Sequence, residues 1–135
     1  MAVTEPSITA PNQAPASLAG GRMRVAACIF TFASDAPAAY TLPIILPKGA
    51  RVWDARFNLS ASAGGTATLA FGTAASAGKY RAAATLTTTD SWVSSGLNAA
   101  MGAELAADER IVMTVAAAPL PSSGRMVVQF LYTLD

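Results

Sequence analysis

From Met23 onward, apolar side chains recur at every second position, and this period limits what the chain can fold into. In Arg51–Ser60, for example, Trp53, Ala55, Phe57 and Leu59 alternate with mostly polar residues. A β-strand points successive side chains to opposite faces, so this period predicts strands with one buried face. Five segments show this alternation or are apolar on both faces: Arg24–Phe32, Arg51–Ser60, Thr66–Gly72, Arg110–Val115 and Arg125–Leu134.

Turns rich in glycine, proline and serine separate the predicted strands. Pro47–Gly49 precedes one strand, and Ser62–Gly65 is expected to join two strands as a hairpin. The segment Leu97–Glu109 is either a short helix or a loop, because Gly102 interrupts residues that favour a helix. Several short strands with at most one helix predict an all-β fold, an antiparallel β-sandwich or jelly-roll-like single domain over residues 23–135.

Residues 1–22 differ from the rest of the chain. They contain Pro6, Pro11 and Pro15 and close with Gly20 and Gly21. Proline fixes φ and lacks an amide donor, so this stretch cannot hold a regular helix and is a poor central strand. We predict an extended N-terminal arm over residues 1–22, joined to the domain by a glycine hinge. A disordered terminus is the alternative.

The polar residues exclude several classes of function. The chain has no histidine and one cysteine, which removes Ser-His-Asp and Cys-His catalysis, internal disulfides and the common zinc sites. Nine basic and eight acidic residues give a net charge of +1, too little to attract nucleic acid or an anionic membrane. No segment has the nearly continuous apolar character of a membrane-spanning helix, and the N-terminus does not resemble a signal peptide. We therefore expect no cofactor, no metal, no nucleic-acid partner and no membrane association.

One acidic cluster is a possible catalytic device. Glu104, Asp108 and Glu109 lie close in sequence. Glycoside hydrolysis requires two carboxyl groups facing each other across a cleft. Neighbours in sequence rarely provide that geometry, and Arg110 beside them offers a counter-charge. The sequence favours a solvated loop, and we expect no catalytic residues.

The aromatic residues divide into core and surface candidates. Trp53, Phe57 and Tyr132 fall on alternating apolar faces and are predicted to lie in the core, as is Cys28. Trp92 and Tyr80 lie in polar surroundings and are the candidates for exposed interaction aromatics. Such side chains stack on sugars or anchor protein interfaces.

Three segments together resemble a known group of proteins. Leu46–Val52 leads into a strand, Gly65–Ala75 is rich in alanine, threonine and glycine and is followed by Lys79 and Tyr80, and Leu105–Val115 precedes the final strand. This pattern of composition and strand order over residues 40–134 resembles the small β-sandwich decoration (cement) proteins of tailed bacteriophage capsids.

The resemblance implies a non-enzymatic virion protein, synthesised in the host cytoplasm, that binds the major capsid protein on the outer surface of the shell. It further implies a homotrimer that stabilises neighbouring capsid subunits. The low charged fraction of 13% suits extensive subunit contacts. Candidate capsid or subunit contacts lie in the arm and at the start of the first strand: Val3, Ile8, Leu18, Arg22 and Arg24.

A second class of function stays open. Trp92 and Tyr80 could form the platform of a carbohydrate-binding module or of a phage fibre or adsorption domain.

Overall fold

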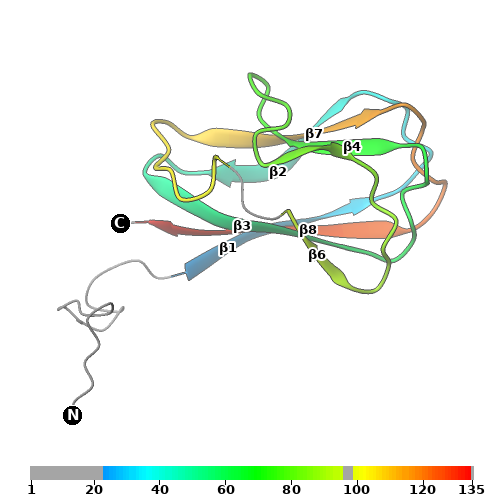
Figure 1. The fold of residues 1–135 in the computed structure, drawn as a ribbon, viewed down its shortest axis with the longest axis horizontal. Helices are drawn as coiled ribbons and strands as arrows, with labels where there is room; N and C mark the ends of the chain where they lie inside the picture. Colours follow the sequence, from blue (N-terminus) through cyan, green and yellow to red (C-terminus); the bar gives the residue numbers. More distant parts are fainter. Residues whose placement is uncertain (1–22, 96–98, 135) are drawn as a thin grey trace, which may run out of the picture.

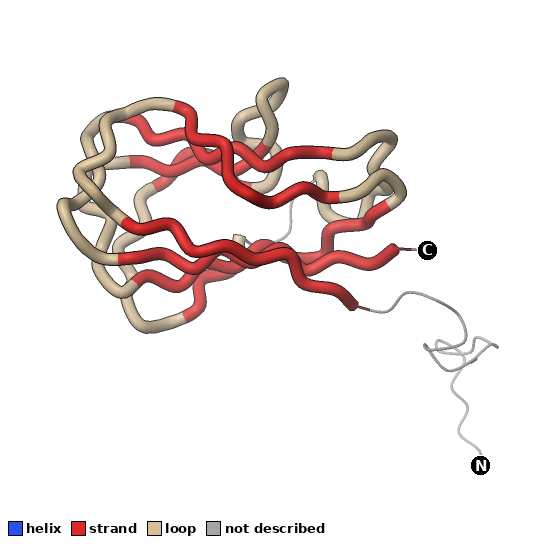
Figure 2. Tube along the Cα trace, turned by 180° about the vertical axis from the view of Figure 1, so that it is seen from behind, coloured by secondary structure: helices blue, strands red, loops and turns tan. Residues whose placement is uncertain are grey.

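The computed structural model describes residues 23–95 and 99–134 as a sandwich of two antiparallel sheets (Figure 1). The chain traces eight strands in order: β1 (Met23–Thr31), β2 (Ala39–Leu46), β3 (Ala50–Leu59), β4 (Thr68–Gly72), β5 (Arg81–Ala84), β6 (Trp92–Ser94), β7 (Glu109–Ala116) and β8 (Arg125–Leu134). Seen from behind, the described segments consist of strands and loops (Figure 2). The predicted all-β sandwich is confirmed.

The strand order is that of a jelly roll. One sheet, called sheet A here, has the order β1-β8-β3-β6, and the other, sheet B, has the order β2-β7-β4-β5. The first strand pairs with the last, the second with the seventh, the third with the sixth and the fourth with the fifth, all antiparallel. This nested pairing is a long hairpin wrapped into two layers, the double-sheet arrangement of jelly rolls.

The core fills the space between the two sheets. Inward-facing aromatic rings from both layers meet there, with the centroids of Phe57 and Phe71 4.4 Å apart and those of Tyr80 and Phe130 5.4 Å apart. All four rings are fully buried. The alternation predicted for the last two strands is confirmed for the residues that form the core. Ile111, Met113 and Val115 are buried in β7, and Met126, Val128 and Phe130 in β8.

A β-bulge in β3 overturns the prediction that Trp53 is a core residue. The pairing of β3 with β8 shifts register between Val52 and Asp54. A bulge adds one residue to one strand and therefore reverses the inward and outward alternation across it. Val52 and Ala55 consequently both point inward, and Trp53 is 48% exposed.

One predicted connection differs from the structure, and a second takes one of its two predicted forms. Ser62–Gly65 does not close a hairpin, because β3 and β4 lie in different sheets and β3 already has β8 and β6 on its two sides. Residues 99–108 form a loop, which is one of the two predicted alternatives, and Glu109 begins β7. The Leu105 N–H donates to the Ala50 carbonyl oxygen at 2.9 Å, so this loop pairs with the start of β3 instead of forming a helix. The described part of the chain contains no helix long and apolar enough to cross a membrane.

Candidate interaction surface

The outer face of sheet A carries most of the exposed apolar surface. Of the six large hydrophobic side chains exposed among the described residues, five lie on this sheet: Met23, Val25, Ile29, Trp53 and Trp92. The sixth, Ile45, lies on β2 of the other sheet. Single exposed apolar residues are ordinary, whereas several gathered on one face mark an interaction surface.

Strand β1 contributes the most apolar part of this face. Its outward side chains Val25 and Ile29 are 53% and 59% exposed. In register, Val25 lies opposite Leu131 and Ile29 opposite Val127, so the apolar surface continues onto β8. The sequence of this segment is apolar on both faces, and the structure exposes the face formed by its odd-numbered residues. Arg24, the one charged residue of β1, is exposed but belongs to the even-numbered set.

Polar contacts fix the β3 and β6 side of the same face. The Arg56 guanidinium lies over the Trp92 ring, 4.9 Å from its centroid, and donates to Gln129 Oε1 at 2.9 Å. Nearby, Ser94 Oγ donates to Asp54 Oδ1 at 2.7 Å. Trp53 is held by a hydrogen bond from its Nε1 to Thr133 Oγ1 at 2.9 Å. The two exposed tryptophans are thus positioned by neighbours before any partner binds.

A small open pocket of about 210 Å³ lies beside Trp92. It is lined by Asn58, Ser60, Asp90, Trp92, Arg125 and Val127. An aromatic ring next to an amide, a hydroxyl and one charge of each sign provides both donors and acceptors without a net charge. Trp92 is 45% exposed, as predicted, and belongs to the short strand β6.

Tyr80 is not an exposed aromatic, and this expectation is wrong. Its side chain is fully buried, and its hydroxyl donates to Glu109 Oε1 at 2.6 Å. Lys79 Nζ pairs with Glu109 Oε2. Burial raises the pKa of Tyr80, and the hydrogen bond to Glu109 and its negative charge raise that pKa further. No local pattern could have shown this burial, because Tyr80 lies just before β5 and contacts Glu109 and Phe130, which are distant in sequence.

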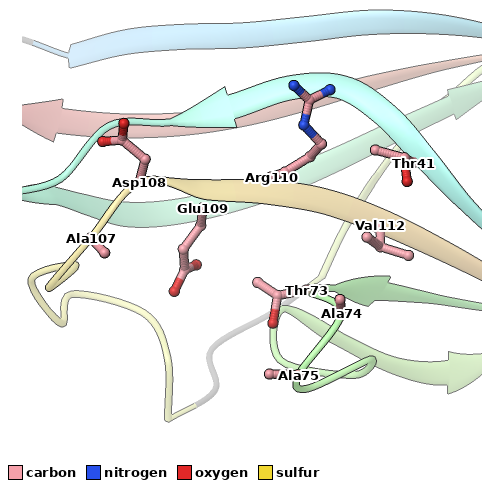
Figure 3. A pocket seen from close by; sticks show the side chains of 9 residues that line it. All are labelled: Thr41, Thr73, Ala74, Ala75, Ala107, Asp108, Glu109, Arg110 and Val112. Carbon is pink, nitrogen blue, oxygen red and sulfur yellow. The ribbon is translucent and has the colours of Figure 1, made fainter.

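Two members of the acidic cluster, Asp108 and Glu109, line a second open pocket, of about 460 Å³, on the outer side of sheet B (Figure 3). The third, Glu104, forms an isolated β-bridge with Arg51 instead. Asp108 and Glu109 point to opposite sides of the chain there and do not face each other (Figure 3). Asp108 Oδ1 accepts a hydrogen bond from the Lys48 N–H at 2.7 Å, and Glu109 holds Tyr80 and Lys79. Both carboxylates have structural partners, and the geometry does not form an acid/base pair. Among the described residues, no group of three or more potential metal ligands comes together.

Cys28 is half-buried and packs against the core, and burial raises the pKa of its thiol. The arm candidates Val3, Ile8, Leu18 and Arg22 lie outside the described residues.

The similarity of this chain to known proteins comes from solved structures. No protein-family model and no curated protein matches the chain. A chain of the cyanophage Pam1 capsid asymmetric unit is 26% identical, with 100% of both chains covered and a TM-score of 0.69. The predicted resemblance to phage capsid proteins is confirmed.

Two further phage capsids contain the same fold. A chain of the acidic stable capsid of Helicobacter pylori bacteriophage KHP30 is 17% identical over 85% of this chain and 90% of that chain, with a TM-score of 0.61. A chain of the capsid of Ralstonia phage GP4 is 17% identical over 94% of this chain and 90% of that chain, with a TM-score of 0.66.

Proposed function

We propose that the chain is a non-enzymatic structural protein of a phage capsid, bound to the outer surface of the shell as a decoration or cement protein. The observation that carries this proposal is the similarity to a chain of the Pam1 capsid over the full length of both chains. The function needs no catalytic group and no cofactor. It places the protein on the virion after synthesis in the host cytoplasm.

The outer face of sheet A is the proposed contact surface. Its exposed apolar side chains on β1, together with Trp53 and Trp92, offer area that a protein partner can bury. Apolar and aromatic residues with few charges are typical of the centre of such interfaces. By binding across neighbouring copies of the major capsid protein, the protein would resist their separation.

The proposed assembly is a homotrimer in which the N-terminal arm, residues 1–22, adds contacts. Val3, Ile8 and Leu18 supply apolar groups in the arm, and Arg22 and Arg24 supply charge where it meets β1. A closed ring of three copies would let each arm reach a neighbour.

Density-gradient co-sedimentation with shells of the phage that encodes the protein tests this proposal. Co-migration at a fixed, saturable copy number is the expected result. Ile29→Lys on the outer face of sheet A should reduce binding at least tenfold. Ile45→Lys, at a similarly exposed position on sheet B, is the matched control and should bind like the unmodified protein. Failure of the unmodified protein to co-migrate with mature shells would refute the cement function.

A second candidate function is favoured by the pocket beside Trp92. Neutral sugars combine an apolar ring face with hydroxyl groups that donate and accept hydrogen bonds, which matches the lining of this pocket. The alternative is therefore a carbohydrate-binding or adsorption domain that uses Trp92, without Tyr80.

A glycan panel separates this alternative from the cement function. If it holds, Trp92→Ala abolishes glycan binding while Trp53→Ala, at the other half-exposed tryptophan, retains it. An absence of binding across the panel would exclude it.

A further inference from the structure

The sandwich has four sheet edges, and they differ in how well they resist pairing with another chain. Edge strand β2 contains Pro43 and a register shift, β5 has four residues and a register shift, and β6 has only three residues. Proline, bulges and short length are the usual protections of a sheet edge. Strand β1 has none of them. It runs for nine residues in unbroken register with β8, contains no proline and carries a single charge, Arg24.

The pairing of β1 with β8 determines which backbone groups face the free edge. The Phe32 N–H, just after β1, donates to the Gly124 carbonyl oxygen, just before β8, at 2.8 Å. Hydrogen-bonded pairs alternate along an antiparallel ladder, so the even-numbered residues of β1 bond to β8. The odd-numbered residues, including Val25, Ala27 and Ile29, therefore turn their N–H and C=O groups toward the free edge. Their side chains are the exposed ones on the outer face of sheet A.

The arm sequence between Ser7 and Ala19 has a matching period of two. Its even-numbered residues are mostly apolar: Ile8, Ala10, Asn12, Ala14, Ala16 and Leu18. Its odd-numbered residues are mostly polar or proline: Ser7, Thr9, Pro11, Gln13, Pro15, Ser17 and Ala19. In an extended strand, residues of one parity share both a face and a direction of their N–H groups. The backbone nitrogen atoms of both prolines, which carry no hydrogen, can therefore point away from β1 toward solvent. Every even-numbered residue keeps an N–H donor that can point toward β1, as an added edge strand requires.

The geometry points to residues 7–19 of a second copy as the occupant of this edge, added as a fifth strand beside β1. Its even-numbered residues would bond to Val25, Ala27 and Ile29 and place Ile8 and Leu18 on the outer face, which continues the apolar surface. This inference rests on the proposed function only in taking the arm as a contact between copies.

A second copy fits better than the arm of the same chain. The two-residue hairpin that Gly20 and Gly21 would favour makes residues 19 and 22 a hydrogen-bonded pair. In that pattern the even-numbered residues of β1 would turn their N–H and C=O groups toward the free edge. In the structure, those groups bond to β8 instead. Residues 20–22 remain as the link between β1 and the added strand and reach about 10 Å when extended. The β1 edge of the second copy must therefore lie close to the start of β1 in the first.

A pair of proline variants of the full chain tests whether the even-numbered residues of the arm, and not the odd-numbered ones, bond to β1. Ala16→Pro removes a donor that faces β1, and Ser17→Pro, one residue later, removes a donor that faces solvent. Sedimentation velocity should show that the unmodified chain self-associates, that Ala16→Pro lowers the association constant about tenfold, and that Ser17→Pro leaves it unchanged. Equal effects of the two variants, or a monomeric unmodified chain, would overturn the inference.

Photo-crosslinking identifies which copy provides the strand. A photoreactive residue at Gln13 is placed in a light-isotope chain and mixed with a heavy chain that lacks it. Light-to-heavy crosslinks that map to residues 23–31 support exchange between copies. Crosslinks confined to the light chain show that the arm folds back on its own β1 and overturn the inference. Shell co-sedimentation of the same variants tests the cement function separately from the strand exchange. If the chain is a monomer but still binds shells saturably, the cement function holds and the strand exchange is refuted.

Discussion

Replacing Tyr80 by phenylalanine removes one hydroxyl group from the interior and tests whether the hydrogen bond from Tyr80 to Glu109, within sheet B, stabilises the fold. The hydroxyl donates to a carboxylate at 2.6 Å, and a hydrogen bond to a charged group contributes about 1.5–3 kcal/mol. Tyr80→Phe keeps the ring that packs edge-on against Phe130. We therefore expect the free energy of unfolding at pH 7 to fall by about 1.5–3 kcal/mol, measured by urea denaturation.

The same variant gives a pH dependence with a defined sign. Burial and Glu109 raise the pKa of Tyr80 in the folded protein above its ordinary value near 10. Between pH 10 and 11 the phenol ionises in the unfolded chain and stays protonated in the folded one, so the unfolded state binds fewer protons and stability falls as pH rises. For one such group, the loss between pH 7 and pH 11 is about 1.4 kcal/mol.

Comparing the two proteins isolates this contribution, because all other titrating groups are shared. The stability advantage of the unmodified protein over Tyr80→Phe should shrink by about 1.4 kcal/mol between pH 7 and pH 11. An advantage that is below about 0.5 kcal/mol at pH 7, or that does not change with pH, would refute the account of Tyr80 given above.

Three further predictions concern other parts of the molecule. Gly124→Ala should destabilise the fold by about 1–3 kcal/mol in urea denaturation, because Gly124 has φ +115° and a Cβ there would lie 2.7 Å from Ala61 Cβ; an unchanged midpoint would contradict this. Deleting residues 1–22 should leave the circular dichroism spectrum of the sandwich intact and weaken shell attachment; an unchanged bound stoichiometry would count against the arm. Cys28 should react with a thiol reagent more slowly than free cysteine at pH 8, since burial raises the pKa of its thiol. A rate equal to that of free cysteine would show that the thiol is exposed to solvent.

The strands whose faces alternate strictly could be predicted from sequence. Thr66–Gly72, Arg110–Val115 and the first half of the last strand follow the period of two, and their apolar residues are buried as expected. Strand β2 was missed because Pro43 interrupts it, and only the edge position, which no local pattern reveals, makes that proline acceptable.

The errors have one common cause, which is that local patterns do not specify partners. The exposure of Trp53 depends on a bulge opposite β8, a strand near the other end of the chain. The burial of Tyr80 depends on the distant Glu109 and Phe130. For the candidate surface, the sequence indicated Trp92 and the apolar first strand. It could not show that they share one sheet with Trp53, since that follows from the strand order.

The nested pairing of the strands also governs when the molecule can assemble. The innermost pair, β4 with β5, joins neighbouring segments, whereas β1 must wait for β8, the strand farthest from it in the described sequence. Pairings between distant segments form slowly, and unpaired strand edges aggregate when they are exposed too early. Until β8 lies beside it, β1 has two unpaired edges, and it carries the fewest features that protect a strand edge. We therefore expect aggregation during folding to involve β1 first.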